Sequence, residues 1–261
     1  MPDTIDITVD ARGVAVLMLD MPERHNALAP QMIAELTEAA ERLGSDPAVR
    51  VVVLTGNGKS FCAGGDLAWM KEQMAADGAT RASEARKLAE MLGALDRMPK
   101  PLIGRVQGQA FGGGIGMMSV CDVAVGVEGA RFGLTETRLG LIPATIGPYV
   151  VARMGAARAR RVFMSARIFD AAEAVDLGLL AKVVPAGDLD AAVEAEVAPY
   201  LACAPGAVAR AKALIAKLEP RVDDAVVAMT IDALVAAWES DEAPEGVSAF
   251  FEKRKPRWQE S

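Results

Sequence analysis

The chain has 261 residues, of which 52% are hydrophobic and 24% are charged. This composition supports a sizeable packed core and excludes an intrinsically disordered protein. The formal net charge of −7 argues against a general nucleic-acid-binding surface, which is normally basic, but it leaves room for a local basic pocket that binds an anionic ligand.

The cysteine and histidine contents restrict the chemistry further. Cys62, Cys121 and Cys203 are far apart and form no CxxC pair, which predicts a reducing compartment without disulfides. His25 is the single histidine, so a zinc site and a Ser-His-Asp triad are both disfavoured, although aspartates and glutamates could still hold a hard cation. We therefore expect no metal cofactor. The sequence lacks a signal-peptide pattern and an apolar run of about 18 residues, so we expect a cytoplasmic protein without a membrane or nucleic-acid partner.

From the N-terminus, apolar and β-branched residues predict two strands at 5–9 and 14–19. Apolar residues at helical spacing then predict a helix from Pro30 to about Gly44. Three further buried strands are predicted at 51–54, 102–106 and 123–127, and helical stretches are predicted around 67–76 and 79–97. This alternation of strands and helices indicates an α/β fold with a largely parallel sheet.

After about residue 186 the chain becomes Ala-rich and helical in period, at 188–202, 206–218 and 222–239. We therefore divide it into a core of residues 1–195 and a C-terminal helical region of residues 196–261. The last of these helices carries an apolar stripe that looks too hydrophobic to stand exposed. The stripe consists of Val226, Val227, Ile231, Leu234, Val235 and Trp238.

A glycine-rich loop, GNGKSFCAGGD, follows the strand at 51–54 and could bind a phosphate group. The pattern GxxxxGK[ST] of a phosphate-binding loop is excluded, because Val53 stands where its first glycine belongs. The dinucleotide pattern GxGxxG fails downstream, at Met117 and at Ser119, and no GxSxG motif is present.

Two glycine-rich turns remain, Gly64-Gly65-Asp66 after one buried strand and Gly112-Gly113-Gly114 after the next. If the two strands are adjacent and parallel, both turns lie at the same end of the sheet. Backbone N–H groups could then bind an oxyanion, and the absence of side chains would allow close approach. The spacing alone equally allows two tight turns that need glycine for positive φ angles.

Five segments resemble, in chain order, the signature segments of the enoyl-CoA hydratase/isomerase (crotonase) family. They are PERHNAL, FCAGGDL, GQAFGGGIGMMSVCD, FGLTETRLGLIP and EGVSAFFEKRKP. The resemblance covers nearly the whole chain and implies a spiral of ββα units followed by a helical region that trimerises, as a homotrimer or a dimer of trimers. It also implies an acyl-CoA thioester substrate, whose CoA is the only cofactor, with the thioester oxygen held between the backbone N–H groups of Gly65 and Gly113.

The same resemblance assigns a proton-transfer group. Glu136 matches the family's second catalytic glutamate, whereas its position alone would allow a solvated carboxylate at a helix start. Partial burial beside Leu134 and Leu139 would raise its pKa toward the working pH. Gly116 stands where the family's hydratases usually carry a first glutamate. Two glutamates suit water addition and one in the second position suits isomerisation, so Gly116 weakens the hydratase prediction.

The segment LGLIPATIGPYV favours a hydratase, because it resembles the methylglutaconyl-CoA hydratase branch of the family. We expect an enoyl-CoA hydratase that acts on a branched acyl-CoA, with an enoyl-CoA isomerase as the second hypothesis. A third hypothesis is a non-enzymatic acyl-CoA-binding or RNA-associated member of the family. Glu136 argues against it, because a protein that only binds would not need this residue.

The resemblance also implies contacts with CoA, at Arg24, Ala27, Ala63, Asp66, Leu67, Phe250 and Lys253. The C-terminal residues of this set often reach CoA in a neighbouring subunit. Ordinary surface charge is an alternative for Arg24 and Lys253, and capping of the following helix is an alternative for Asp66.

Overall fold

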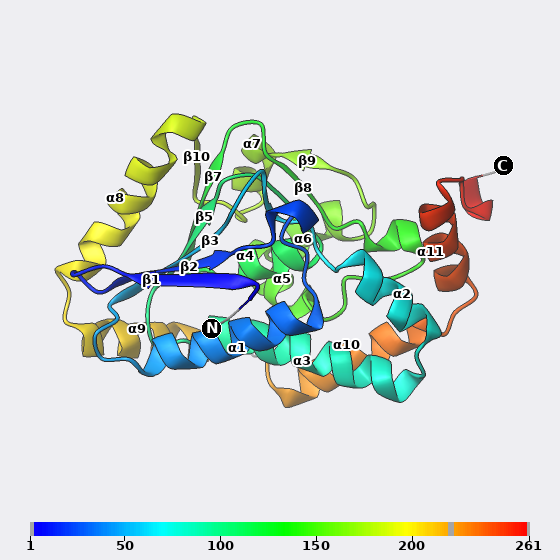
Figure 1. The fold of residues 1–261 in the computed structure, drawn as a ribbon, viewed down its shortest axis with the longest axis horizontal. Helices are drawn as coiled ribbons and strands as arrows, with labels where there is room; N and C mark the ends of the chain where they lie inside the picture. The colour runs from blue at the N-terminus through cyan, green and yellow to red at the C-terminus, as the bar shows by residue number, and fades with distance from the viewer. Residues whose placement is uncertain (1–2, 219–221, 260–261) are drawn as a thin grey trace.

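Two sheets lie side by side in the computed structural model, which describes residues 3–218 and 222–259 (Figure 1). The first sheet has six strands, in the order β1 (Ile5–Val9), β2 (Val14–Leu19), β3 (Val51–Gly56), β5 (Leu102–Val106), β7 (Val123–Val127) and β10 (Lys182–Val184). The second has four short strands, in the order β4 (Ser60–Cys62), β6 (Gln109–Phe111), β8 (Arg131–Gly133) and β9 (Phe169–Asp170).

The first sheet is largely parallel. Only the hairpin of β1 and β2 is antiparallel, and β2, β3, β5, β7 and β10 each pair in parallel with their neighbours. Every residue of β3 is buried, which agrees with the uninterrupted apolar run that predicts this strand and with helices covering both faces of a parallel sheet. The predicted α/β class is confirmed.

The chain repeats a unit of two strands and a helix, and each unit adds one strand to each sheet. β3 and β4 are followed by α2 and α3, β5 and β6 by α4, and β7 and β8 by α5 after a short turn. The helices of this part are α1 (Pro30–Ser45), α2 (Leu67–Ala75), α3 (Gly78–Asp96), α4 (Gly113–Ser119), α5 (Gly147–Met154), α6 (Ala156–Phe163) and α7 (Ala171–Asp176), with 3-10 turns η1 (Pro22–Arg24) and η2 (Glu136–Leu139). Because successive units stack in register, the loops that leave β4 and β6 emerge side by side.

The C-terminal part adds helices to the outside of these sheets. They are α8 (Leu189–Leu201), α9 (Pro205–Leu218), α10 (Asp224–Trp238) and α11 (Glu242–Glu252), with 3-10 turns η3 (Ala186–Asp188) and η4 (Arg257–Gln259). α8 packs against β5 and β7, whereas α10 packs against α3. Figure 1 shows α2, α10 and α11 gathered toward the end of the molecule that holds the C-terminus.

The strands predicted at 5–9, 14–19, 102–106 and 123–127 are confirmed to the residue, and the strand at 51–54 continues to Gly56. The predicted helices begin and end within two residues of those observed. The second sheet was not predicted, because strands of two or three residues are too short to show a period. The division at residue 195 stays a prediction, and this position lies within α8.

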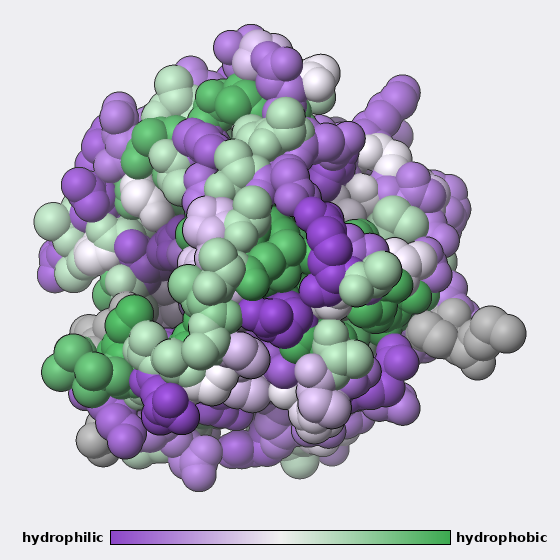
Figure 2. Space-filling view, turned by 90° about the vertical axis from the view of Figure 1, so that its left-hand side faces the viewer, coloured by the Kyte–Doolittle hydropathy of each residue, from purple (hydrophilic) through white to green (hydrophobic). Residues whose placement is uncertain are grey.

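The apolar stripe on α10 is partly covered within the chain itself. Ile231 and Trp238 are buried, and Leu234 and Trp238 pack in a small apolar cluster with Leu141 and Val247. Other apolar side chains remain exposed, on α9 and α10: Leu214, Ile215, Leu218 and Met229. At the α8 end, Figure 2 shows purple hydrophilic residues interspersed with separate green areas rather than one continuous hydrophobic surface. Within the described residues, no helix has the length and apolar character needed to cross a membrane.

Candidate active site

The two glycine-rich turns meet, as predicted, although they follow the short parallel strands β4 and β6 of the second sheet and not β3 and β5 directly. A Cβ placed on Gly64 would lie 3.0 Å from the carbonyl oxygen of Phe111 and 3.7 Å from the backbone nitrogen of Gly113. Gly64 and Gly112 have φ angles of 91° and 46°, in the region that favours glycine, whereas Gly65 and Gly113 have φ angles outside this region. The first two glycines therefore shape the turns, and the other two leave their backbone open to close approach.

Leu28, from the PERHNAL segment, fixes the first turn in place. Its backbone N–H donates to Gly64 (2.7 Å), and its carbonyl accepts from the N–H of Asp66 (2.9 Å). Its side chain also covers the second turn, because a Cβ on Gly113 would lie 2.6 Å from Leu28 Cδ1. One leucine thus holds both turns in contact, although it was not among the predicted site residues.

The turns open into a cavity of about 450 Å³ with mostly apolar walls. Among the residues that line it are Leu28, Ala63, Gly65, Leu67, Trp69, Met70, Arg81, Gly113, Glu136, Leu139, Thr145, Ile146, Ile168, Trp238 and Phe250. Leu67 and Phe250 are about half exposed, so they lie where the cavity meets solvent. Its volume and apolar walls suit a small organic group bound with few polar contacts.

Glu136 begins η2 and is the single carboxyl-bearing residue among those that line the cavity in the described part of the chain. Its Oε2 atom is buried and has no hydrogen-bond partner in the described part of the chain, and its Oε1 atom lies 2.9 Å from the point where a Cβ on Gly112 would stand. Burial raises the pKa of this carboxyl group from 4.5 to about 7. The group can therefore both accept and return a proton near neutral pH.

Most predicted site residues come together at this cavity. Gly65, Gly113, Glu136, Ala63, Leu67 and Phe250 all line it. Arg24 forms an ion pair of 2.6 Å with Asp66 close by. The Asp66 carboxylate also accepts hydrogen bonds from the N–H groups of Ala68 (2.9 Å) and Trp69 (3.2 Å), so the capping alternative is confirmed for this residue. Ala27 and Lys253 are not among the lining residues, and Lys253 ends α11 in a left-handed conformation.

Gly116 lies in α4 with no room for a side chain. A Cβ on this glycine would lie 2.5 Å from Ile146 Cγ2. Ile146 is itself buried and lines the cavity, whereas Gly116 does not. The space that a side chain from this turn of α4 would need is therefore taken by an isoleucine from the loop after η2.

Sequence reasoning did not place Arg81, Thr145 or Trp238 in the site, although all three line the cavity. Arg81 donates to the carbonyl oxygens of Gln73 (2.9 Å) and Met74 (3.1 Å), and its guanidinium group lies 5.5 Å from the centre of the Trp238 ring. It forms no ion pair with the residues that the structure describes. The local sequence around Arg81 contains no motif, so its place is set by the packing of α3 against α2 and α10.

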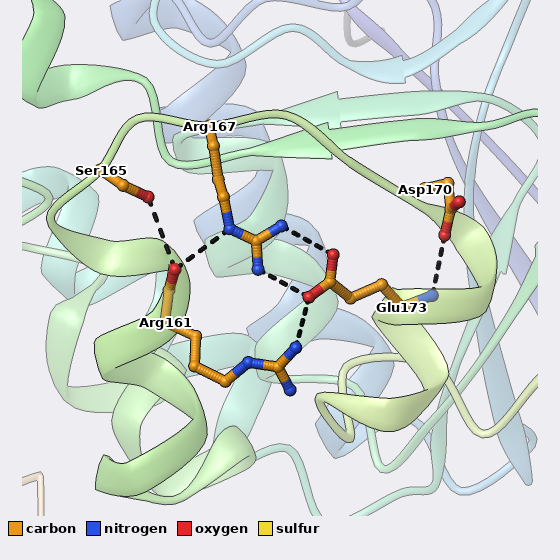
Figure 3. Close-up of polar contacts among 5 residues, drawn as sticks. All are labelled: Arg161, Ser165, Arg167, Asp170 and Glu173. Atoms are coloured by element: carbon orange, nitrogen blue, oxygen red, sulfur yellow. Dashed lines mark hydrogen bonds and ion pairs between the residues drawn. The ribbon is translucent and has the colours of Figure 1, made fainter.

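An ion-pair network holds the segment that carries Ile168, another cavity residue (Figure 3). The Glu173 carboxylate accepts hydrogen bonds from Arg161 (2.7 Å) and from both terminal nitrogens of Arg167 (2.6 and 2.7 Å). Asp170 in turn caps α7 by accepting from the Glu173 N–H. This network ties α6 to α7 and to the segment between them that carries Ile168.

Among the residues that the structure describes, no cluster of histidine, cysteine and acidic side chains has the arrangement of a metal site. His25 donates to or accepts from Ser60 through Nδ1 at 3.0 Å, so it is a loop side chain with a partner. Cys62 and Cys121 are buried in the core, and burial raises the pKa of both thiols to about 12. None of these residues lines the cavity.

Comparison with known proteins places this geometry in a family. A model of the family "Enoyl-CoA hydratase/isomerase" matches residues 10–261. Over 244 residues the chain is 31% identical to the crotonyl-CoA hydratase of Syntrophomonas wolfei, and the match covers 93% of each protein.

Solved structures give the same result. An enoyl-CoA hydratase from Shewanella pealeana superposes with a TM-score of 0.81 at 37% identity, over 99% of this chain and 97% of that one. An enoyl-CoA hydratase from Mycobacterium avium superposes with a TM-score of 0.86 at 32% identity, over 99% of this chain and 100% of the other.

Proposed function

Because the chain belongs to the enoyl-CoA hydratase/isomerase family, we propose that it is an enoyl-CoA hydratase, which adds water to an α,β-unsaturated acyl-CoA. The observation that carries this proposal is the position of Glu136. Its Oε2 atom is buried without a hydrogen-bond partner among the described residues, and Glu136 lines the same cavity as Gly65 and Gly113. The names of the related hydratases support the same reaction.

The two glycines would polarise the thioester carbonyl group. We assign its oxygen to the backbone N–H groups of Gly65 and Gly113, which carry no side chain that blocks approach. Such a pair stabilises the enolate oxyanion, and the loss of one donor typically costs about 2.7–4 kcal/mol of transition-state stabilisation. The polarised thioester makes the β-carbon electrophilic and the α-carbon basic once the enolate has formed.

One carboxyl group can complete the proton balance. The water oxygen forms a bond to the β-carbon while the Glu136 carboxylate takes one water proton, and the electrons of the carbon–carbon double bond move to the thioester oxygen. The enolate then collapses, and the Glu136 carboxylic acid gives its proton to the α-carbon. The pKa of about 7 suits both halves of this exchange.

CoA would enter the cavity at its opening to solvent, where Leu67 and Phe250 are about half exposed. Ala63, Leu67 and Phe250 line this region, and Arg24 lies beside it in its ion pair with Asp66. The remaining contacts that the resemblance implies, Ala27 and Lys253, would act outside the cavity, where the nucleotide portion of CoA and a neighbouring subunit would lie. No cofactor besides the CoA of the substrate is needed for the reaction.

For the acyl group we propose a branched chain with a terminal carboxylate, as in a methylglutaconyl-CoA. Arg81 supports this, because it lines a mostly apolar cavity without an ion-pair partner among the described residues; the exposed Arg138 is a second cationic residue in the lining. Its partners are backbone carbonyl groups, which leave part of its hydrogen-bonding capacity for a carboxylate. Trp69, Met70 and Trp238 give the apolar surface that a branched acyl chain requires.

A matched pair of variants tests this substrate. Arg81→Met should weaken use of a methylglutaconyl-CoA by about 10- to 100-fold in kcat/KM while crotonyl-CoA hydration stays within about twofold, because the lost contact is to a charged group. Arg81→Lys keeps the positive charge and should fall between Arg81→Met and the unchanged protein. An equal loss for both substrates would show that Arg81 only supports the fold through α2.

The second candidate is an enoyl-CoA isomerase, and Gly116 is the observation that favours it. An isomerase needs the same oxyanion site and one carboxyl group, but it needs no place for a water molecule. Incorporation of oxygen from water distinguishes hydration from isomerisation, because only hydration adds an oxygen atom to the product.

We also propose that the protein assembles as a trimer or a dimer of trimers. The exposed apolar side chains of α9 and α10, Leu214, Ile215, Leu218 and Met229, support an interface there. Light scattering should give a mass that is a multiple of three chains. A monomer that stays active at dilution would contradict this assembly.

A further inference from the structure

The proposed hydratase reaction requires a second group, besides Glu136, that holds the water molecule. The inference below, which names this group, rests on the proposed hydratase function. Glu136 is the single carboxyl group among the described lining residues, and Ile146 occupies the space next to Gly116 from which α4 could supply another. The loop after η2, which carries Ile146, therefore forms the wall of the cavity at this point. We therefore looked on that loop for a polar side chain that could bind the water molecule.

Thr145, the residue before Ile146, has the required properties. It is only 5% exposed, it lines the cavity, and its hydroxyl oxygen has no hydrogen-bond partner among the described residues. A buried hydroxyl group left without a partner costs about 1–3 kcal/mol of stability. Such a group in a folded protein calls for an explanation, and one explanation is a ligand that occupies the cavity.

Glu136 and Thr145 lie on the same short segment, and both line the cavity. The backbone N–H of Leu141 donates to the carbonyl oxygen of Glu136 at 3.1 Å, which folds the segment back on itself. Further on, the N–H of Gly147 donates to the carbonyl of Ala144 at 3.0 Å and tightens the turn that contains Thr145. Both residues thus present a buried oxygen atom without a partner to one cavity.

We propose that the Thr145 hydroxyl group binds and orients the water molecule that attacks the β-carbon. A buried water molecule typically needs two to four polar partners, and a carboxylate together with a hydroxyl group supplies two. The carboxylate accepts one water hydrogen, and the hydroxyl group, which can both donate and accept, fixes the direction of the water oxygen. Thr145 thereby takes the orienting part of the role that a second glutamate would have, while Glu136 alone moves the proton.

The other buried polar atoms without a partner do not serve this purpose. Trp69 Nε1 can only donate, and the Trp69 ring lies over Gly65, with Cε3 and Cζ3 4.0 Å from the Cβ position of that glycine. Glu84 Oε2 belongs to a residue of α3 that does not line the cavity. Thr145 is the remaining choice within the described part of the chain.

Two substitutions at this position test the inference. Thr145→Val keeps the shape but removes the hydroxyl group, and it should lower kcat for hydration by about 10- to 100-fold. Thr145→Ser keeps the hydroxyl group and should retain most of the activity. Thr145→Val should melt at the same temperature as the unchanged protein or higher, because it removes a buried group that lacks a partner.

A second reaction separates water binding from proton transfer. Exchange of the α-hydrogens of a saturated acyl-CoA in deuterated water needs Glu136 and the oxyanion site, but it adds no water. Thr145→Val should leave this exchange unchanged, whereas Glu136→Gln should abolish it. Hydration by Thr145→Val at the unchanged rate, or an equal loss of exchange and hydration, would overturn the role of Thr145. If the unchanged protein exchanges α-hydrogens but hydrates no 2-enoyl-CoA, the proposed function fails and this inference fails with it.

Discussion

Ile146 packs against Gly116 so closely that a side chain at position 116 has no room unless Ile146 changes. A Cβ on Gly116 would lie 2.5 Å from Ile146 Cγ2, which is closer than real carbon atoms approach, and 3.0 Å from Ile146 Cβ. Both residues are buried, so neither has solvent to move into. Any side chain at position 116 would therefore compete with Ile146 for the same space.

This packing predicts a coupled effect on stability. Gly116→Glu alone should destabilise the protein strongly, because it adds a clash and buries a carboxyl group, and Ile146→Ala alone should cost about 2–5 kcal/mol through the cavity it leaves. The double variant should lose less than the sum of the two losses, because the smaller side chain makes room for the larger one. Urea unfolding of all three variants measures this coupling, and additive losses would show that the two positions do not compete for space.

The Glu136 carboxyl group should control the pH dependence of hydration. As a carboxylate it accepts the water proton, so kcat/KM should rise about tenfold per pH unit up to a pKa of about 7 and then level off. Glu136→Gln should lose turnover by about 10²–10⁴-fold while it keeps its fold and its affinity for CoA. Steady-state rates between pH 5 and 9 test this, and near-native turnover by Glu136→Gln would remove the residue from the mechanism.

The same carboxyl group should affect stability in a defined pH range. Burial raises its pKa from 4.5 to about 7, so between these values the folded protein keeps a proton that the unfolded chain releases. The contribution of this group to the free energy of unfolding therefore falls as the pH rises through that range, and it is constant above about 7. Thermal melts at pH 5 to 8 should show a steeper decline for the unchanged protein than for Glu136→Gln, and parallel curves would contradict the raised pKa.

Gly65 allows its backbone N–H group to be tested separately from its lack of a side chain. A Cβ at this position would have its nearest neighbours, in Met70 and Trp69, at 3.9–4.0 Å, so Gly65→Ala fits without a clash and keeps the N–H group. Gly65→Pro removes that group, and kcat should fall by about 10²–10³-fold relative to Gly65→Ala. The comparison requires that both variants show the circular dichroism of the unchanged protein. Equal rates would show that Gly65 donates no hydrogen bond to the substrate.

Five of the six strands of the first sheet could be predicted from the sequence, because each is a short apolar run between turn residues, as with Leu102–Val106. The sixth strand, β10, was not predicted, because its three residues are too few to show a period. The glycine turns and Glu136 could be predicted to share a site because their segments follow known motifs. Arg81, Thr145 and Ile146 could not, because their importance depends on what lies opposite them after packing. The closed space beside Gly116 is a property of two segments that are 30 residues apart, so only the structure shows it.

Oxygen incorporation from labelled water tests the central claim most directly. The unchanged protein is incubated in ¹⁸O-water with a panel of 2-enoyl-CoA and 3-enoyl-CoA esters that includes crotonyl-CoA and a methylglutaconyl-CoA, and the products are weighed by mass spectrometry. A hydratase gives a β-hydroxyacyl-CoA that carries one labelled oxygen, with the branched, carboxylate-bearing ester used best. Conversion of 3-enoyl esters to 2-enoyl esters without labelled oxygen in any product would contradict the account and identify the protein as an isomerase.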